Sequence, residues 1–170
     1  MENVLFWLLP ALFLSGCSTD RSIPAVENFN IKHYMGTWYE IARLPNRFER
    51  GMTKVSAEYT LLPSGMVKVV NQGIKNDVRK SITGTARKVS GSSGGELEVS
   101  FFKPFFSSYR IVKLAPDYRY SIVLGGSRQM LWILSRTRTL SPEDSAEIRE
   151  FLLKHNFPVD KLICSWNIRF

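Results

Sequence analysis

Hydrophobic and polar residues alternate with a period of two along much of the chain, most clearly in residues 55–62 and 96–101. In the first of these stretches Val55, Ala57 and Tyr59 share one face, and the residues between them are polar. Such alternation predicts an antiparallel sheet with one dry face and one wet face. Turn residues follow at fairly even intervals, which is typical of an all-β barrel or sandwich. The predicted strands cover residues 38–44, 55–62, 66–71, 81–89, 96–101, 109–114, 120–124 and 130–136.

The hydrophobic period changes after these strands. Residues 141–144 read Ser-Pro-Glu-Asp, which combines a capping side chain, a proline at the first turn and two acids beside the positive end of the helix dipole. Ile148, Phe151 and Leu152 then recur at helical spacing. We therefore predict one C-terminal α-helix that ends at residues 156–158. Two smaller elements complete the pattern, a helical turn over 31–35 and a short final strand over 161–166.

The first residues form a separate apolar segment. Residues 4–14 carry no charge and are interrupted only by Pro10. This run is shorter than the roughly 20 residues of a transmembrane helix but has the length of a signal-peptide core. Small residues follow and lead to Cys17, although no Lys or Arg precedes the run, which leaves the start site open. We predict that residues 1–16 are an export signal; a buried or disordered hydrophobic tail is the alternative.

Composition and charge fit one exported globular domain. The chain has 170 residues, of which 44% are hydrophobic and 12% aromatic, enough for one hydrophobic core. Its 23 Lys and Arg face 15 Asp and Glu; loss of Glu2 with the leader leaves 14 acids and a side-chain charge of +9. A net positive charge is compatible with binding to nucleic acid, with binding to an anionic membrane surface, or with solubility alone. Export argues against nucleic acid and favours the membrane surface.

Cysteine and histidine are too scarce for the common catalytic and metal sites. Cys17 and Cys164 are the only cysteines, and His33 and His155 are the only histidines. The two histidines lie before and after the predicted strands, so neither a histidine-based triad nor a paired-histidine metal site is expected. Cys164 has no basic neighbour in sequence, and we expect a buried, inert thiol. We predict that the chain is not an enzyme and that it needs no metal or cofactor.

Three separated motifs resemble the lipocalin family. They are Gly-Thr-Trp-Tyr-Glu-Ile-Ala at 36–42, Pro-Asp-Tyr-Arg-Tyr at 116–120 and Leu-Trp-Ile-Leu-Ser-Arg-Thr at 131–137. Two further stretches, 47–51 and 101–105, resemble bacterial members of its apolipoprotein D-like branch. The resemblance implies an eight-stranded antiparallel up-and-down barrel, followed by one α-helix and a short final strand.

The family's signature positions are structural in this resemblance. Trp38 would close one end of the barrel, Arg136 would lay its guanidinium across the indole, and Gly36 would let the backbone pass beneath. Asp117 and Tyr118 would form the turn between the sixth and seventh strands. These residues close the barrel and do not select the ligand. The structural signature is Gly36, Trp38, Asp117, Tyr118 and Arg136.

The residues around Cys17 resemble a bacterial lipobox, Leu-Ser-Gly-Cys. In that family the cysteine thiol takes a diacylglyceryl group, the leader is cut before it, and the new amino terminus takes a further acyl chain such as palmitate. Three chains exceed the two signals that stable anchoring needs. The resemblance implies a leader over 1–16, a lipidated tether over 17–30 and a lipocalin domain over 31–170. Ser18 after the cysteine implies the outer membrane as destination.

By the same resemblance, the barrel cavity holds one lipid. A fatty acid or lysophospholipid would be stored or transported there for maintenance of the cell envelope. Alternation from Arg136 places Met130, Trp132 and Leu134 on the inner face, and the alternative for each is ordinary core filling. Glu40 shares the face of Trp38, so a buried carboxylate there would need an Arg or Tyr partner.

The first long loop is expected to overhang the open mouth and to contain Arg43, Arg47 and Arg50. An arginine there could pair with a carboxylate or phosphate, and a solvated basic loop is the alternative. Phe105 and Phe106 are expected in the turn after the fifth strand, at the rim. The candidate ligand-binding residues are Trp132, Tyr59, Val69, Phe101, Phe105, Phe106, Met130, Leu134, Glu40 and Arg47.

Other functions stay open at this point. An envelope lipoprotein could act on a protein partner through its outer wall, with a filled barrel. Another hydrophobic ligand, such as haem or another tetrapyrrole, has no local signature here. The resemblance also leaves a homodimer open, in addition to the lipid and the membrane as partners.

Overall fold

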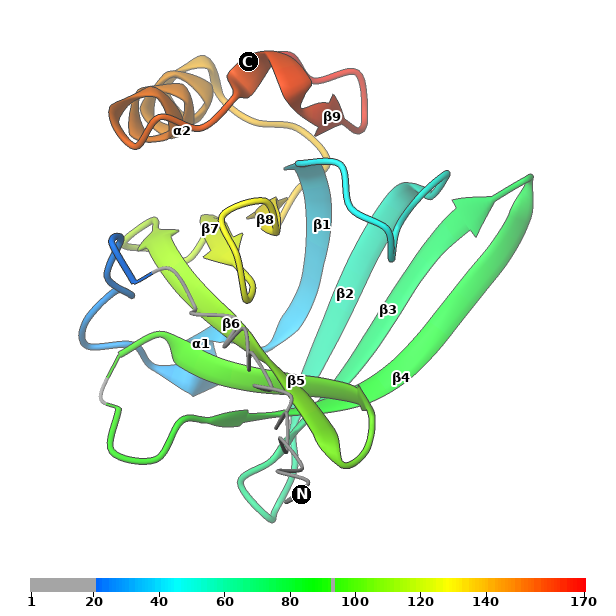
Figure 1. Ribbon diagram of the computed structural model, residues 1–170, viewed down its shortest axis with the longest axis vertical. Coiled ribbons are helices and arrows are strands. Elements are labelled where there is room, and N and C mark those ends of the chain that lie inside the picture. The colour runs from blue at the N-terminus through cyan, green and yellow to red at the C-terminus, as the bar shows by residue number, and fades with distance from the viewer. Residues whose placement is uncertain (1–20, 93) are drawn as a thin grey trace, which may run out of the picture.

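A single antiparallel sheet closes on itself to form the body of the molecule (Figure 1). The computed structural model describes residues 21–92 and 94–170, so the expected leader and Cys17 lie outside the described residues. The strands are β1 (Gly36–Arg43), β2 (Thr53–Leu61), β3 (Val67–Lys75), β4 (Val78–Lys88), β5 (Glu96–Phe102), β6 (Phe105–Leu114), β7 (Tyr120–Leu124), β8 (Leu131–Ser135) and β9 (Ile163–Cys164). The helices are α1 (Ile31–Tyr34), α2 (Pro142–Lys154) and the short 3-10 helix η1 (Val159–Lys161).

The strand order confirms the predicted barrel. Neighbouring strands from β2 to β8 follow chain order, β8 pairs with β1, and β1 pairs with β2, so eight strands close a ring. Every one of these pairings is antiparallel. The ninth strand bonds to β1 outside the ring through Ala42 and Arg43. The order of eight strands, one helix and one short strand is therefore as predicted.

One of two hydrophobic cores lies outside the barrel, between the sheet and α2. Figure 1 shows α2 outside the barrel, beyond β7 and β8. Ile148 and Leu152, predicted to share one helix face, are fully buried against Ile122 and Ile133 of the sheet. The helix begins as predicted, because the Ser141 hydroxyl accepts a hydrogen bond from the Asp144 amide at 3.1 Å. The helix thus covers one outer face of the sheet, and the barrel encloses a separate core that includes Trp38, Val69 and Leu134.

The β3–β4 hairpin is longer than predicted. Its turn lies at Asn76 and Asp77 as expected, and both residues have positive φ angles, 51° and 59°. The sequence prediction ended the third strand at residue 71 and began the fourth at residue 81, because hydrophobic alternation fades there. The two-residue turn nevertheless fixes the register, so backbone pairing continues to Lys75 and Val78.

The predicted position of Phe105 and Phe106 in a turn is wrong. Phe102 pairs with Phe105, so the turn of the β5–β6 hairpin contains only Lys103 and Pro104. Phe106 therefore belongs to β6, where the guanidinium of Arg87 lies 4.2 Å from its ring centroid. Aromatic side chains favour strands, and here they carry the pairing to the tip of the hairpin.

The predicted tether over residues 17–30 includes residues that belong to the folded body. Ile23 and Phe29 are buried. The backbone of Val26 joins the sheet, donating to the Ile111 carbonyl and accepting from the Gly95 amide, both at 2.8 Å. Two buried side chains and paired backbone groups fix this segment, so from Ile23 onward the chain is part of the folded body.

Cys164 is exposed, which corrects the expectation of a buried thiol. It lies in β9, a strand of two residues at the edge of the sheet. Both residues of this strand are exposed, because no other element packs over it as the barrel packs around its core. Partial burial still raises the pKa of its thiol above the usual value. The thiol is thus accessible but disfavours the reactive thiolate.

Candidate ligand-binding cavity

One end of the barrel is closed around Trp38, as predicted. The indole is fully buried, and the guanidinium carbon of Arg136 lies 4.0 Å from its ring centroid. Arg136 also donates to the carbonyl oxygens of His33 at 2.7 Å and Thr37 at 3.0 Å. The indole nitrogen donates to the Tyr34 carbonyl at 2.8 Å. Gly36 begins the strand with φ of +92°, a conformation that other residues rarely adopt.

The Asp117–Tyr118 turn supports the same end of the barrel. Tyr118 has a φ of 62°, and its hydroxyl accepts from the Asn30 amide at 2.9 Å. Its ring stacks on Phe29, with centroids 6.3 Å apart. Asp117 pairs with Arg119 at 2.9 Å on the surface. Both residues therefore fix the turn and the segment before α1, and lie away from the cavity.

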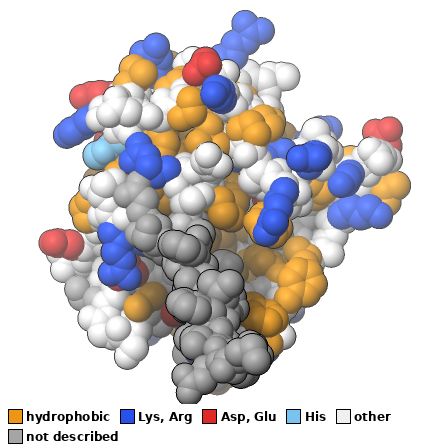
Figure 2. Space-filling view, viewed as in Figure 1, with side chains coloured by type: hydrophobic (Ala, Val, Ile, Leu, Met, Phe, Trp, Pro, Cys, Tyr) orange, Lys and Arg blue, Asp and Glu red, His pale blue; other side chains and the backbone are white. Residues whose placement is uncertain are grey.

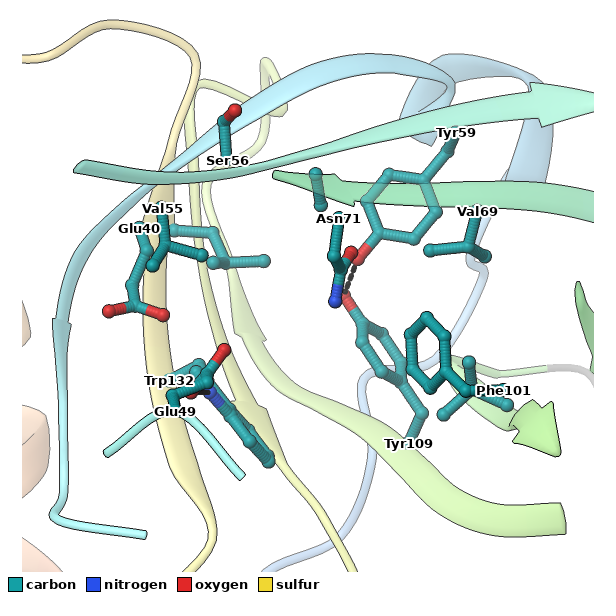
Figure 3. Close-up of a pocket in the computed structure, with 13 residues that line it drawn as sticks. Glu40, Glu49, Val55, Ser56, Tyr59, Val69, Asn71, Phe101, Tyr109 and Trp132 are labelled. Carbon is teal, nitrogen blue, oxygen red and sulfur yellow. Dashed lines mark hydrogen bonds between the residues drawn. The ribbon is translucent and has the colours of Figure 1, made fainter. Parts of the chain in front are cut away.

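The barrel interior contains a cavity with about 570 Å³ of atom-free space, part of it open to solvent (Figure 3). Six of the ten predicted ligand-binding residues line it, drawn from β1, β2, β3, β5 and β8. These six are Glu40, Tyr59, Val69, Phe101, Trp132 and Leu134. The remaining lining residues are Glu49, Val55, Ser56, Ala57, Asn71, Val99 and Tyr109. The wall is mainly apolar, with polar groups gathered in two places.

The other four predicted residues lie outside this lining. Arg47 is exposed on the β1–β2 loop, with its guanidinium 4.9 Å from the Phe48 ring centroid. Met130 precedes β8 and closes a turn, since its carbonyl accepts from the Gly125 amide at 2.8 Å. Phe105 is 78% exposed at the hairpin tip, and Phe106 contacts Arg87. Arg47 thus lies on the first long loop, as predicted, and Phe105 lies at the rim, whereas Met130 and Phe106 do not occupy the expected positions.

A bulge in β1 places Arg43 inside the barrel, although it was expected on the first loop. Glu40 pairs with Leu134 and Ala42 with Ile133, so one extra residue, Ile41, interrupts the ladder. Three positions apart, Glu40 and Arg43 would normally face opposite sides of a strand. The extra residue turns both side chains inward, where each is 2% exposed and the two form an ion pair.

This ion pair anchors the β1–β2 loop over the mouth. The Arg43 guanidinium donates to the carbonyl oxygens of Glu49 at 3.0 Å and Met52 at 2.9 Å. The Glu49 carboxylate accepts from the Trp132 indole at 2.7 Å and from the Asn46 amide at 2.9 Å. Figure 3 shows Glu40, Glu49 and Trp132 together on one side of the cavity. One side of the mouth is therefore a fixed cluster of hydrogen-bonded polar side chains.

The Glu40 carboxyl holds its proton near neutral pH. Burial raises its pKa from 4.5 to about 8, and the charge of Glu49 adds to the rise, against the opposing pull of Arg43. Its second oxygen, Oε2, is buried and has no hydrogen-bond partner among the described residues. The buried amide oxygen of Asn71 is in the same condition. Both residues line the cavity, so a ligand or water that can both donate and accept hydrogen bonds is favoured beside them.

Three tyrosine hydroxyls form a polar floor deeper in the barrel. Tyr109 bonds to Tyr59 at 3.0 Å, as Figure 3 shows. Tyr109 also bonds to Tyr34 at 2.9 Å, and Tyr34 bonds to Ser121 at 3.0 Å. Burial raises the pKa of Tyr34 to about 12 and moves the pKa values of Tyr59 and Tyr109 well above 10. All three hydroxyls are therefore neutral and act as hydrogen-bonding groups only.

Replacing Tyr109 by phenylalanine is expected to lower the free energy of unfolding by about 1–3 kcal/mol, because the buried Tyr59 hydroxyl loses its partner. Urea unfolding followed by circular dichroism measures the change. Tyr59→Phe is the matched control: it removes one hydrogen bond but leaves the Tyr34–Tyr109 bond, so a smaller loss is expected. Equal stability of Tyr109→Phe and the unaltered chain would show that the trio contributes nothing.

Some of the lining residues were missed although alternation indicates them. Asn71 follows Val69 by two positions, and Val99 precedes Phe101 by two, so each shares its neighbour's face. Tyr109 and Glu49 carried no comparable signal. The inward face of β6 depends on its register against β5, and Glu49 lies on a loop with no periodicity.

Metal ligands and membrane-spanning helices were also sought in the described part of the chain. Within residues 21–92 and 94–170, no three His, Cys, Asp or Glu side chains gather in a way that could hold a metal ion. No helix in those ranges has the length and apolar character needed to cross a membrane.

A closed antiparallel barrel with one plugged end and an internal cavity defines a class of protein, the eight-stranded barrels with a helix packed outside. The chain can be placed more narrowly. A family model for the lipocalin-like domain matches residues 29–166, so the chain belongs to the lipocalin family.

Similar proteins include bacterial and animal relatives. The chain is 40% identical over 158 residues to "Outer membrane lipoprotein Blc" of Escherichia coli (strain K12), covering 90% of this chain and 89% of the relative. It is 32% identical over 183 residues to "Apolipoprotein D" of Oryctolagus cuniculus, covering 95% and 94%. Insecticyanin of Manduca sexta has the same fold, with a TM-score of 0.69 and 20% identity over 83% of this chain and 82% of that chain.

Proposed function

We propose that this chain is a membrane-anchored lipocalin that binds one lipid, a fatty acid or lysophospholipid, in the barrel cavity. The observation that carries the proposal is the cavity itself: a mainly apolar wall with one plugged end and an opening to solvent. Val55, Val69 and Leu134 line it beside Phe101 and Trp132. The ligand would be stored or transported for maintenance of the cell envelope.

Burial of the acyl chain supplies the affinity in this proposal. Transfer of a 16-carbon chain from water gains about 0.8 kcal/mol per methylene, or on the order of 12 kcal/mol before the costs of ordering. The apolar wall accepts the chain, and the headgroup stays near the mouth. At the mouth, the oxygens of the headgroup can accept hydrogen bonds from the exposed Arg47 and Arg50 and from water.

Anchoring through an acylated Cys17 is part of the proposal. The bacterial relatives carry the name outer membrane lipoprotein, which supports the same address for this chain. The leader and Cys17 lie outside the described residues, so the support comes from the Leu-Ser-Gly-Cys sequence and from these relatives. Ser18 after the cysteine agrees with an outer-membrane address.

We propose binding without catalysis. The family and fold are those of binding and transport proteins. In the cavity, the carboxylates of Glu40 and Glu49 are held by Arg43 and Trp132, and the tyrosine hydroxyls are held by one another. His33 and His155 lie outside the lining. Turnover of a lysophospholipid by the purified protein would contradict this part of the proposal.

Filling the cavity should abolish lipid binding. Val69 is buried and lines the cavity, whereas Val70 is on the opposite face of the same strand. We expect Val69→Phe to lose the acyl lipid that copurifies with the chain, since the added ring occupies the ligand's space, and Val70→Phe to retain it. Mass spectrometry of lipid extracted from Cys17→Ser chains lacking residues 1–16, made in bacteria, measures both.

Two results would contradict the lipid-binding proposal. One is the absence of any enriched acyl lipid in the unaltered chain, together with no quenching of tryptophan fluorescence when lysophospholipid is added. The other is equal lipid content in Val69→Phe and Val70→Phe, with both variants folded by circular dichroism. Either outcome would favour a role for the outer surface in binding a protein partner.

A further inference from the structure

The open end of the barrel carries an unusual concentration of exposed hydrophobic side chains. Of the seven large hydrophobic residues exposed in the described chain, four lie at this end, on a loop or at the strand ends beside a turn: Phe48 is 67% exposed, Val78 52%, Phe102 73% and Phe105 78%. We name these four the apolar rim. Single exposed hydrophobic residues are common on protein surfaces, so it is the shared position of these four at one end of the barrel that calls for an explanation.

The topology places these four residues together. In an up-and-down barrel the β1–β2, β3–β4 and β5–β6 connections all lie at one end. Phe48 is on the first of them, Val78 follows the second as the first residue of β4, and the two remaining phenylalanines flank the third. The opposite end is closed by Trp38. The connections at that closed end contribute none of the seven exposed residues. The apolar rim therefore surrounds the opening of the cavity.

Positive charge surrounds the apolar rim. Residues 44–54, 75–80 and 102–105 contain seven Lys and Arg but only two acids, Glu49 and Asp77. The Glu49 carboxylate is bound to Trp132 and Asn46. Among the described residues, none of the seven basic side chains takes part in an ion pair. The seven are Arg47, Arg50, Lys54, Lys75, Arg79, Lys80 and Lys103, all exposed.

Figure 2 shows the two properties on one side of the molecule. Hydrophobic side chains gather over the β5–β6 hairpin, and Lys and Arg side chains lie over the neighbouring β3–β4 hairpin. Apolar groups at the tips with cations around them match the layered chemistry of an anionic lipid surface, in which phosphates lie above the hydrocarbon.

We propose that the apolar rim docks the open end of the barrel on an anionic lipid bilayer. The rim phenylalanines enter the interface, and the surrounding Lys and Arg contact lipid phosphates. In this orientation the mouth faces the membrane, so an apolar molecule passes between bilayer and cavity without crossing water. The proposal depends neither on acylation of Cys17 nor on which ligand fills the cavity.

A lipid surface fits the rim better than a protein partner. The apolar side chains project from three separate connections between strands, and of the four only Phe102 and Phe105 are paired across a hairpin. Protein interfaces concentrate aromatic residues in a packed centre and have few lysines. Separate apolar tips among lysines suit a fluid interface, which closes around each tip independently.

The orientation of the protein on vesicles tests the proposal. The full-length protein, purified from bacterial membranes with Cys164→Ser, receives one environment-sensitive fluorophore at Lys103→Cys on the rim or at Ser64→Cys in the β2–β3 turn at the opposite end. On vesicles of phosphatidylethanolamine and phosphatidylglycerol, we expect blue-shifted emission and quenching by brominated acyl chains at position 103 but not at position 64. Equal exposure of the two probes to water would overturn the proposal.

Rim variants separate the contributions of apolar tips and charge. Phe102→Ser with Phe105→Ser should return the position-103 probe to water without altering the fold, because both rings are exposed. Phe106→Ser, on the outer wall against Arg87, is the matched control and should keep the probe in lipid. Replacing phosphatidylglycerol by phosphatidylcholine should weaken the shielding. Equal shielding without anionic lipid, or shielding only when membrane proteins are present, would contradict the anionic-lipid assignment.

Discussion

Replacing Trp38 by alanine is expected to lower the free energy of unfolding by about 3–5 kcal/mol, the usual cost of removing a large buried aromatic side chain. The indole is fully buried and lies between the Tyr34 ring, with centroids 4.6 Å apart, and the Arg136 guanidinium. Its loss also leaves the Tyr34 carbonyl without the hydrogen bond that the indole nitrogen donates to it. Guanidinium chloride unfolding, followed by circular dichroism, measures the change.

The contribution of Arg136 can be separated from that of the indole. Arg136→Ala removes the cation–π contact, worth about 0.5–2 kcal/mol, and the two hydrogen bonds to the carbonyl groups of His33 and Thr37. Tyr39→Ala is the matched control, since Tyr39 is the next residue on β1 and packs outside the barrel against Trp166. A loss for Trp38→Ala no greater than that for Tyr39→Ala would show that the plug is not a principal source of stability.

The barrel and much of its interior were predictable because both follow from a period of two. Tyr59, Val69 and Phe101 were assigned inward by alternation and resemblance, and all three line the cavity. The same holds for Trp132 and Leu134, two positions apart on β8. Local signals were equally readable at the helix start, where the Ser141 cap is as predicted.

The polar half of the cavity could not be predicted, because it depends on breaks in that period. The bulge at Ile41 changes which side of the strand Arg43 faces, and nothing in the sequence marks a bulge there. Glu49 reaches Trp132 from a loop, 83 positions away in the chain. Such contacts depend on how the barrel closes, which is a property of the whole sheet.

The polar cluster around Glu40 and Arg43 and the apolar rim are linked through the β1–β2 loop. Arg43 holds the loop from inside by the carbonyl groups of Glu49 and Met52. Asn46 holds it from within, since its side-chain oxygen accepts from the amides of Phe48 at 3.1 Å and Glu49 at 3.0 Å. The exposed Phe48 ring is therefore presented by a fixed turn, so the geometry of the rim depends on the buried pair Glu40 and Arg43.

Replacing Arg43 by methionine is expected to lower the free energy of unfolding by about 3–5 kcal/mol at about pH 9, because Glu40 then has no counter-ion and must be buried either as an unpaired carboxylate or with a proton that the unfolded chain has released. The loss should be smaller at about pH 6, where Glu40 is protonated and carries no charge to compensate. Urea unfolding at both values measures the difference, and ligand binding should weaken in parallel as the loop over the mouth loses its anchor.

The direction in which stability changes with pH follows from the pKa of Glu40, which is 4.5 for the ordinary group and about 8 in the folded chain. Between these values the folded state binds a proton that the unfolded state has lost. Stability from this group is therefore full below pH 4.5 and is lost as the pH rises to about 8, by at most about 1.4 kcal/mol per pH unit. Removing Arg43 raises the pKa of Glu40 further and extends the decline to higher pH.

Two control variants isolate the carboxyl group in this prediction. Glu40→Gln keeps the shape of the side chain without its titration, so the decline between pH 4.5 and about 8 should flatten. The double variant Glu40→Gln with Arg43→Met removes both charges and should be more stable at about pH 9 than Arg43→Met alone. If Arg43→Met cost the same at both pH values, the loss would come from the hydrogen bonds to the loop carbonyl groups and not from the buried charge.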